Sequence, residues 1–147
     1  MPGSFADIEV GDRVETQGRT ITEADVVNFA GLSGDFNHLH TDAEAMADSG
    51  FGERIAHGAL VFAVMTGLLW QSRSEAEREH VVAFYGIDGL RFVNPCFIGD
   101  TIHLKREVIE KEPREHPVAS GTVRYDTRAV NQDGDVVIAA EFISLLS

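Results

Sequence analysis

The sequence of 147 residues contains a single cysteine, Cys96, so the chain cannot form an internal disulfide. Disulfide frameworks are typical of small secreted domains, so this lack argues against that class and favours a reducing, cytoplasmic location. Cys96 follows a proline, and no base stands close to it in the sequence. We therefore expect a small side chain packed in the interior rather than a nucleophile.

Basic residues are also scarce, because 12 Lys and Arg stand against 24 Asp and Glu, which gives a formal net charge of −12. A surface of this charge repels nucleic acids and anionic lipids, so neither is expected as a main partner. The longest apolar run, from Ala59 to Trp70, is interrupted by Thr66 and Gly67 and is too short to cross a bilayer. The first twelve residues lack the basic and apolar regions of a signal peptide.

The residues that are present, 44% apolar and 24% charged, are typical of a folded globular protein, and the length predicts one domain over residues 1–147. The first half predicts a weak strand followed by three helical segments with recognisable start and stop residues. The strand covers residues 12–20, and the helices cover 22–34, 42–50 and 57–71. Residues 35–41 and 51–56 predict loops, and residues 72–79 predict a solvated helix end or a linker.

From Val81 onward the pattern predicts strands, at 81–93, 101–112, 118–130 and 136–146. Alternation places Ile102, Leu104 and Arg106 on one face of the second of these strands. Because the connections are short, we expect an antiparallel meander packed against the central apolar helix, which is an α+β fold. The expected core includes Val26, Val27, Phe29 and Ala30 of the first helix, together with Phe36, Phe62, Met65 and Trp70.

The chemistry is expected in the stretch from Ser33 to Gly58. Asp35 and His40 are a carboxylate and an imidazole in one loop, and such a pair can hold a water and exchange protons with it. Asn37 can orient the loop or a substrate through its amide. His57 and Gly58 begin the central helix, where a free backbone N–H of Gly58 can bond a carbonyl oxygen that gains charge.

Each of these features also has an ordinary structural interpretation. Asp35 can simply cap a turn by bonding its own backbone, and His57 can be a helix-end residue without a chemical role. His38 and His40, with Asp35 and Asp42 near them in the sequence, form at most a weak metal-binding pattern, because no third ligand stands at helical spacing. We therefore expect no metal and no cofactor.

Two motifs in this region resemble the (R)-specific enoyl-CoA hydratases and MaoC-like dehydratases of the hot-dog superfamily. The first motif of that family is Gly-Asp-x-Asn-Pro-x-His-x-Asp followed by Ile-x-His-Gly, and the second is Arg-Phe-x-x-Pro-x-x-x-Gly-Asp. The matching residues here are Gly34, Asp35, Asn37, His40, Asp42, Ile55, His57, Gly58, Arg91, Phe92, Pro95, Gly99 and Asp100. The resemblance covers roughly residues 8–146. The family's proline is replaced by His38, and a serine common in its central helix aligns with Thr66.

The resemblance implies a hot-dog fold in which residues 35–54 overhang the active site, and a homodimer or higher homo-oligomer whose sheets join edge to edge. It implies reversible syn addition of water to a trans-2-enoyl-CoA, giving an (R)-3-hydroxyacyl-CoA. Asp35 and His40 would be the catalytic pair, and Gly58 N–H would polarise the thioester carbonyl. Asn37, His57 and Thr66 would support substrate binding.

Several alternatives stay open at this point. One is a dehydratase dedicated to a branched, dicarboxylic or carrier-bound acyl thioester, and another is a non-catalytic subunit that binds acyl-CoA. A thioesterase is disfavoured, because related thioesterases carry a carboxylate on the central helix and residues 58–71 contain none. The phosphates of coenzyme A would need basic partners, and the candidates are Arg91, Lys105, Arg106, Arg114, Arg124 and Arg128.

Overall fold

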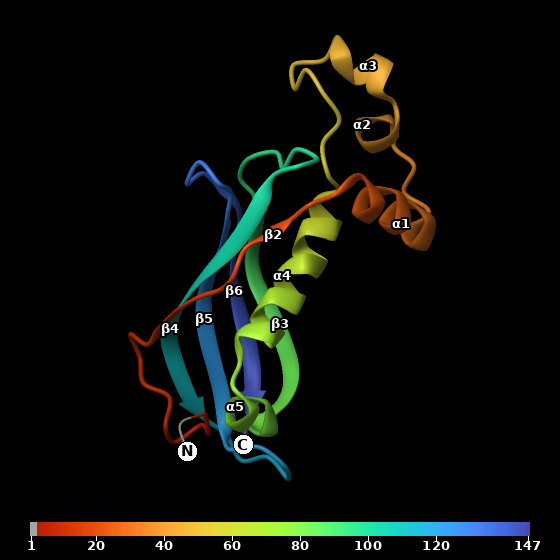
Figure 1. Cartoon of the computed structure of the whole chain (residues 1–147). Helices are drawn as coiled ribbons and strands as arrows, with labels where there is room; N and C mark the ends of the chain where they lie inside the picture. Colours follow the sequence, from red (N-terminus) through yellow and green to blue (C-terminus); the bar gives the residue numbers. More distant parts are fainter. Residues whose placement is uncertain (1–2) are drawn as a thin grey trace.

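The computed structural model describes residues 3–147 and shows a long helix lying against one face of an antiparallel sheet (Figure 1). The strands are β1 (Arg13–Glu15), β2 (Arg19–Thr20), β3 (Val81–Phe92), β4 (Thr101–Pro113), β5 (Gly121–Val130) and β6 (Val136–Leu146). The helices are α1 (Glu23–Ser33), α2 (His38–Thr41), α3 (Ala43–Ala47), α4 (Gly58–Ser72) and α5 (Glu75–His80). This is the predicted α+β arrangement.

The strands of the sheet follow the order β1-β4-β5-β6-β3, all neighbours are antiparallel, and β2 also pairs with β4. The predicted meander is therefore correct for β4, β5 and β6 but wrong for β3, which pairs with β6 instead of β4. The reason is the connection over residues 93–100, which is longer than a hairpin loop. It crosses the end of the sheet, where Val93 N–H donates to the Val137 carbonyl at 2.8 Å.

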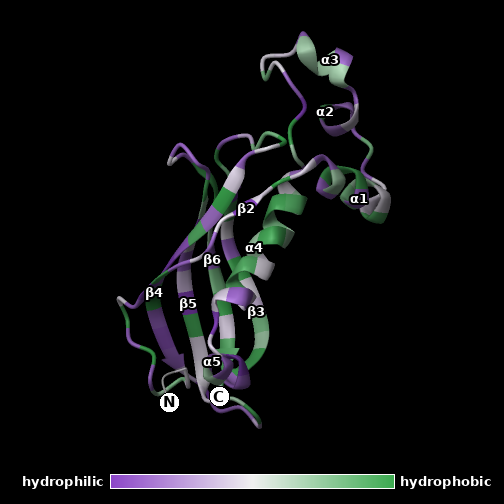
Figure 2. Cartoon of the chain, in the orientation of Figure 1, coloured by the Kyte–Doolittle hydropathy of each residue, from purple (hydrophilic) through white to green (hydrophobic). Residues whose placement is uncertain are grey.

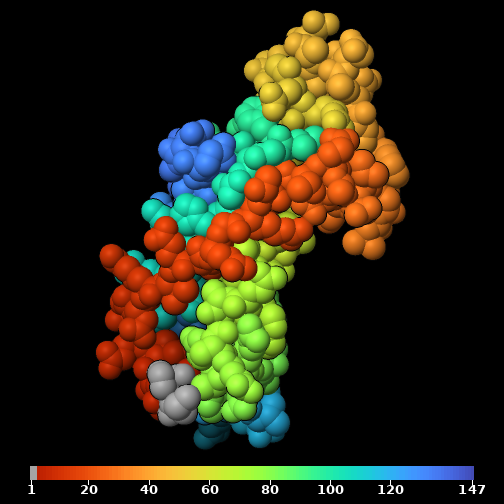
Figure 3. Space-filling model, viewed as in Figure 1, coloured from red at the N-terminus to blue at the C-terminus, as the bar shows by residue number. Residues whose placement is uncertain are grey.

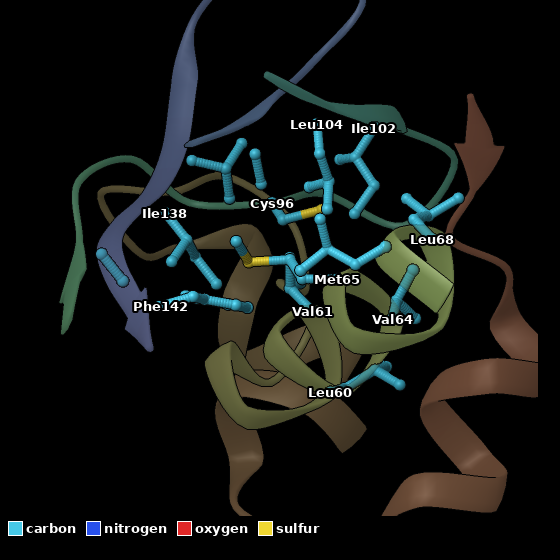
Figure 4. Close-up of a cluster of buried hydrophobic side chains, with 14 of the residues drawn as sticks. Leu60, Val61, Val64, Met65, Leu68, Cys96, Ile102, Leu104, Ile138 and Phe142 are labelled. Carbon is cyan, nitrogen blue, oxygen red and sulfur yellow. The ribbon is translucent and has the colours of Figure 1, made fainter. Parts of the chain in front are cut away.

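Helix α4 forms the centre of the core, and its apolar residues cover most of its circumference (Figures 2 and 4). The largest contribution comes from Leu60, Val61, Val64, Met65 and Leu68, which pack against side chains from β4, β5 and β6. A helix with so little polar surface is stable only when it is covered, and the curved sheet supplies that cover. Among residues 3–147, none of the helices is long and apolar enough to cross a membrane.

Some residues predicted for the core lie elsewhere. Val26 and Ala30 are buried as expected, but Val27 is exposed. Met65 is fully buried and Phe62 packs partly against the core, whereas Phe36 and Trp70 are exposed. Fewer apolar residues of α1 are buried than we predict from the sequence, because this helix packs against α4 along only part of its surface.

Side-chain capping sets the helix boundaries in the first half of the chain. Thr22 and Asp25 form a capping box at the start of α1, and Gly34 ends that helix with φ 77°, a conformation that glycine adopts at little cost. Ser74 and Glu77 form a second capping box, so the predicted linker after α4 contains α5. Asn37 caps α2, a single helical turn in a segment that was predicted to be a loop.

Candidate functional site

Residues 35–54, which carry α2 and α3, project beyond the end of the sheet, and we call this segment the overhang (Figures 1 and 3). A few polar contacts fix its base. Arg54 pairs with Glu23 of α1 at 2.6 Å and also donates to the His40 carbonyl at 3.2 Å. The hydrogen-bonded ion pair between Arg54 and Glu23 holds the pKa of Glu23 below its ordinary value and raises that of Arg54. Sequence reasoning missed the tether by Arg54.

The overhang brings Asp35 and His40 together as predicted. Asp35 Oδ2 lies 3.9 Å from His40 Nε2, which is too long for a direct hydrogen bond but allows both groups to contact one water. His40 is buried, and its Nδ1 lies 2.7 Å from the Ile55 carbonyl. A carbonyl only accepts hydrogen bonds, so Nδ1 carries the proton and Nε2 is the atom presented to Asp35.

His57 lies beneath this pair rather than in contact with the cleft described below. Its ring is only 2% exposed and stacks on the His40 ring with a centroid separation of 3.7 Å. Its Nε2 lies 2.9 Å from the Asp35 carbonyl, to which it donates, and its Nδ1 is buried without a partner in the described part of the chain. This geometry favours a role in positioning both Asp35 and His40 over the predicted contact with substrate.

Gly58 is the first residue of α4, and its N–H therefore has no acceptor within the helix. It lines a cleft of about 550 Å³ together with His40 and mostly apolar side chains, among them Phe51, Ile55 and Phe92. A side chain at Gly58 would collide with the ring of Phe92. Glycine is thus the residue that allows the Phe92 ring to lie close to the helix end. Sequence reasoning did not identify Phe92 as a cleft residue.

The other predicted residues lie at different distances from this cleft. Asn37 holds the loop, because its Oδ1 accepts from Leu39 N–H and its own N–H donates to Asp35 Oδ1. His38, which replaces the family's proline, is exposed. Thr66 is two turns, about 12 Å, along α4 from Gly58, and its hydroxyl donates to the Ala63 carbonyl. Within one chain Thr66 therefore lines a separate cavity.

Asp35, His40 and His57 each offer one possible ligand atom, and these atoms lie within 4.8 Å of one another. This cluster differs from the metal pattern considered in the sequence, since His38 is exposed and Asp42 caps α3. A divalent cation bound here would compete with the carbonyl contacts of the two imidazoles for their nitrogens. The absence of a metal stays a prediction.

Cys96 is buried, as expected, and burial raises the pKa of its thiol to about 12. Three of the basic residues considered for coenzyme A phosphates are engaged elsewhere: Arg114 pairs with Glu112, Arg128 with Asp126, and Arg124 with three carboxylates. Arg106 is buried. Arg91 is exposed beside Phe92 at the cleft and forms no ion pair within residues 3–147.

Comparison with known proteins places this geometry in context. The chain is 45% identical over 101 residues to Protein MaoC of Klebsiella aerogenes, a match that covers 69% of this chain but only 29% of that protein. It is 31% identical over 140 residues to the (R)-specific enoyl-CoA hydratase of Aeromonas caviae, covering 95% of this chain and 96% of the hydratase.

A solved structure confirms the fold. A protein from Mycobacterium tuberculosis, described as a double hot-dog fold, superposes with a TM-score of 0.81 at 21% identity, over 97% of this chain and 43% of its own. The model of the MaoC like domain matches residues 6–131. Relatives in this family carry the names of hydratases and dehydratases that act on acyl thioesters. The chain has the hot-dog fold and belongs to the MaoC-like dehydratase family.

Proposed function

We propose that this protein catalyses the reversible syn addition of water to a trans-2-enoyl-CoA, which gives an (R)-3-hydroxyacyl-CoA. The observation that carries the proposal is the 3.9 Å separation of Asp35 Oδ2 and His40 Nε2 beside an apolar cleft. This separation supports the proposal, because two groups of different basicity can then contact one water at a place where an acyl group can lie. The name of the Aeromonas caviae relative supports the same reaction.

The reaction requires the pair to hold one transferable proton at the start, either on the Asp35 carboxyl or on His40 Nε2. In the hydration direction, the member without that proton takes one from the water while the water oxygen bonds to the β-carbon. The carbon–carbon double bond opens toward the thioester, and the other member delivers a proton to the α-carbon. Both additions come from the side on which Asp35 and His40 lie, so the outcome is syn. Proton transfer between the two groups then restores the starting state, and dehydration is the same path reversed.

The N–H of Gly58 would stabilise the charge that develops on the thioester oxygen. A donor at a helix N-terminus is fixed in direction and needs no reorganisation during the reaction, and removal of such a donor in other enzymes costs roughly 10²–10³ in kcat. His57 would hold the Asp35 backbone and the plane of the His40 ring by the contacts described above. We expect the pair to work without a metal, so that a chelator leaves the rate unchanged.

We further propose that the protein acts as a homodimer joined through β3. This strand is an edge of the sheet, and several of its apolar side chains are exposed: Val82, Phe84, Tyr85, Leu90 and Phe92. A long apolar edge strand is prone to pair with another chain. A second copy can add its own β3 antiparallel, which would extend the sheet across a two-fold axis.

The test is the loss of enoyl-thioester ultraviolet absorbance with trans-2-enoyl-CoA substrates of increasing length. We expect turnover by the native protein, formation of the (R) product, and loss of turnover in Asp35→Asn. Conversion of carrier-bound substrates alone would instead favour a dedicated dehydratase. Acyl-CoA binding without turnover of any substrate would contradict the proposal and favour a binding subunit.

A further inference from the structure

A second cavity, of about 250 Å³, lies between the C-terminal half of α4 and the sheet. We call it the tail cavity. Apolar side chains such as Leu69, Phe84 and Phe142 form much of its wall, but Thr66, Arg106 and Tyr125 also line it. Ligand cavities in proteins are commonly lined by apolar side chains. A buried guanidinium group in the wall of such a cavity is unusual, because burial of a charge without a partner is costly.

Arg106 lies on the core face of β4 with only 8% of its surface exposed. Its Nη1 is buried without a hydrogen-bond partner, and within residues 3–147 no carboxylate forms an ion pair with it. Burial lowers the pKa of Arg106 below its ordinary value, but a guanidinium still stays charged at neutral pH. A buried charge without a counter-charge is costly, so we expect Arg106 to have an anionic partner that comes from outside the chain.

The surroundings of Arg106 favour an anion. Its guanidinium stacks 4.5 Å from the centre of the Tyr125 ring, and the Tyr125 hydroxyl is also buried with no hydrogen-bond partner among residues 3–147. Arg73 lines the same cavity, and no ion pair is formed by it within residues 3–147. Asp12 and Glu77 line a neighbouring cavity together with Arg106, but neither forms an ion pair with it within residues 3–147. Asp12 accepts from Glu9 N–H, and Glu77 serves the capping box of α5. Guanidinium and hydroxyl donors with unused hydrogen bonds are the groups that bind a carboxylate.

The proposed dimer connects this cavity to the site of reaction. Val81 and Phe84, near one end of β3, line the tail cavity, whereas Phe92, at the other end, lines the cleft that contains His40 and Gly58. When two copies of β3 pair antiparallel about their midpoints, the Val81 end of one copy lies beside the Phe92 end of the other. The tail cavity of one protomer then faces the catalytic cleft of its partner.

We propose that the tail cavity receives the far end of the acyl group and that Arg106, assisted by Tyr125, binds a carboxylate there. The substrate would thus be an enoyl thioester of a short dicarboxylic acid rather than of a simple fatty acid. This inference rests on the proposed function, since it identifies the substrate class for the same reaction. The cavity volume, about eight times the roughly 30 Å³ of a water in liquid, limits the tail to a few carbon atoms.

The experiment measures binding by calorimetry of two saturated thioesters of equal length, pentanoyl-CoA and glutaryl-CoA, which end in a methyl and a carboxylate respectively. Free coenzyme A is the third ligand. The variants are Arg106→Met and Arg106→Lys, with Arg128→Met as the matched control, because Arg128 is an arginine of β5 that does not line the tail cavity. A buried charge without a partner is costly, and methionine is an unbranched apolar side chain that can fill the same space, so Arg106→Met is expected to fold.

We expect the native protein to bind glutaryl-CoA about 10²-fold more tightly than pentanoyl-CoA. Arg106→Met should abolish that ratio, Arg106→Lys should retain part of it, and Arg128→Met should leave it unchanged. Equal or tighter binding of pentanoyl-CoA by the native protein would overturn the inference, and so would an unchanged ratio in Arg106→Met. An equal loss of affinity for free coenzyme A would overturn it too, because Arg106 would then hold a phosphate.

Because the ligands are saturated, binding is measured without turnover. A glutaryl preference that depends on Arg106, in a protein that hydrates no enoyl thioester, would support the carboxylate site and contradict only the proposed reaction. Hydration of simple enoyl-CoA substrates without any preference for glutaryl-CoA would support the proposed reaction and contradict only the carboxylate site. Failure of both thioesters to bind would overturn both proposals.

Discussion

The overhang and the core are held together in different ways. In the core, α4 and the sheet share a continuous cluster of buried apolar side chains. In the overhang, Met46 is the one buried apolar residue. Polar and ring contacts join the overhang to the rest of the chain: the ion pair of Arg54 with Glu23, the bond of His40 to the Ile55 carbonyl, and the contacts of His57 with Asp35 and His40. Buried apolar area sets stability, whereas a few polar contacts set the geometry of Asp35 and His40.

This difference teaches that activity and stability are separable in this protein. Exposed polar residues in the overhang can change with little loss of folding free energy, because little apolar surface is buried there. The same changes alter the spacing of the catalytic pair, and small displacements of such groups cost much of a reaction rate. The predictions below test this separation, in order of decreasing effect.

The largest effect is expected for Asp35→Asn. The amide keeps the shape of the side chain but cannot accept a proton, so we expect the hydration rate to fall by roughly 10²–10⁴-fold. The melting temperature should stay nearly constant, since the side chain is 51% exposed. Asp48→Asn is the matched control, because Asp48 is an exposed carboxylate of the same overhang. A large shift in melting temperature for Asp35→Asn would contradict the separation.

The opposite behaviour is expected for Leu68→Ala in the core. Leu68 is 2% exposed, and its truncation should lower the free energy of unfolding by about 2–5 kcal/mol, measured by urea denaturation. The rate per folded molecule should change little. Leu32→Ala removes the same group from a side chain that is 84% exposed and should cost almost nothing. Equal losses in both variants would show that the core assignment is wrong.

A smaller effect is expected when the overhang is released from α1. Arg54→Gln removes the ion pair with Glu23, so we expect the turnover rate to fall about tenfold through a misplaced His40, at nearly constant stability. Glu23→Gln should lower the rate by less, since Arg54 keeps its bond to the His40 carbonyl. Because the pKa of Glu23 is lowered, the pair is intact at neutral pH and is lost only as the pH falls through that value. Unchanged kinetics in both variants would exclude this tether.

The smallest effect concerns the reactivity of thiols, which should differ between the core and the overhang. The thiol of Cys96, with a pKa of about 12, should not react with iodoacetamide at pH 8 in the folded protein but should react after denaturation, as followed by mass spectrometry. In a variant with Ala47→Cys, the introduced thiol lies at an exposed position of α3 and should react at once. Rapid modification of Cys96 in the folded native protein would show that the core opens.

The sequence predicted those parts of the fold that depend on local chemistry. Capping by Thr22, the stop at Gly34 and the apolar run of α4 all act within a few residues, and the helices lie where these signals place them. The pairing of β3 with β6 was missed because strand order depends on contacts between distant segments. The small helix α5 was missed because its capping box, Ser74 and Glu77, was not recognised in a charged segment.

The candidate site was predicted to a similar extent. The spacing of Asp35, His40 and Gly58 brought these residues to one end of α4, as the family motif implied. The buried position of His57 and the distance of Thr66 from the cleft were not predictable, since both depend on tertiary packing. Alternation placed Arg106 on the core face of β4, but only the structure reveals that it forms no ion pair with any of residues 3–147.

The central claim is that Asp35 and His40 act together on one water. The most direct test compares the hydration rates of Asp35→Asn, His40→Gln and the double variant. Residues that act as a unit have non-additive effects, so we predict that the double variant is no more than a fewfold slower than the slower single variant. If the two losses multiply in the double variant, the residues act independently, and the shared water between them would be contradicted.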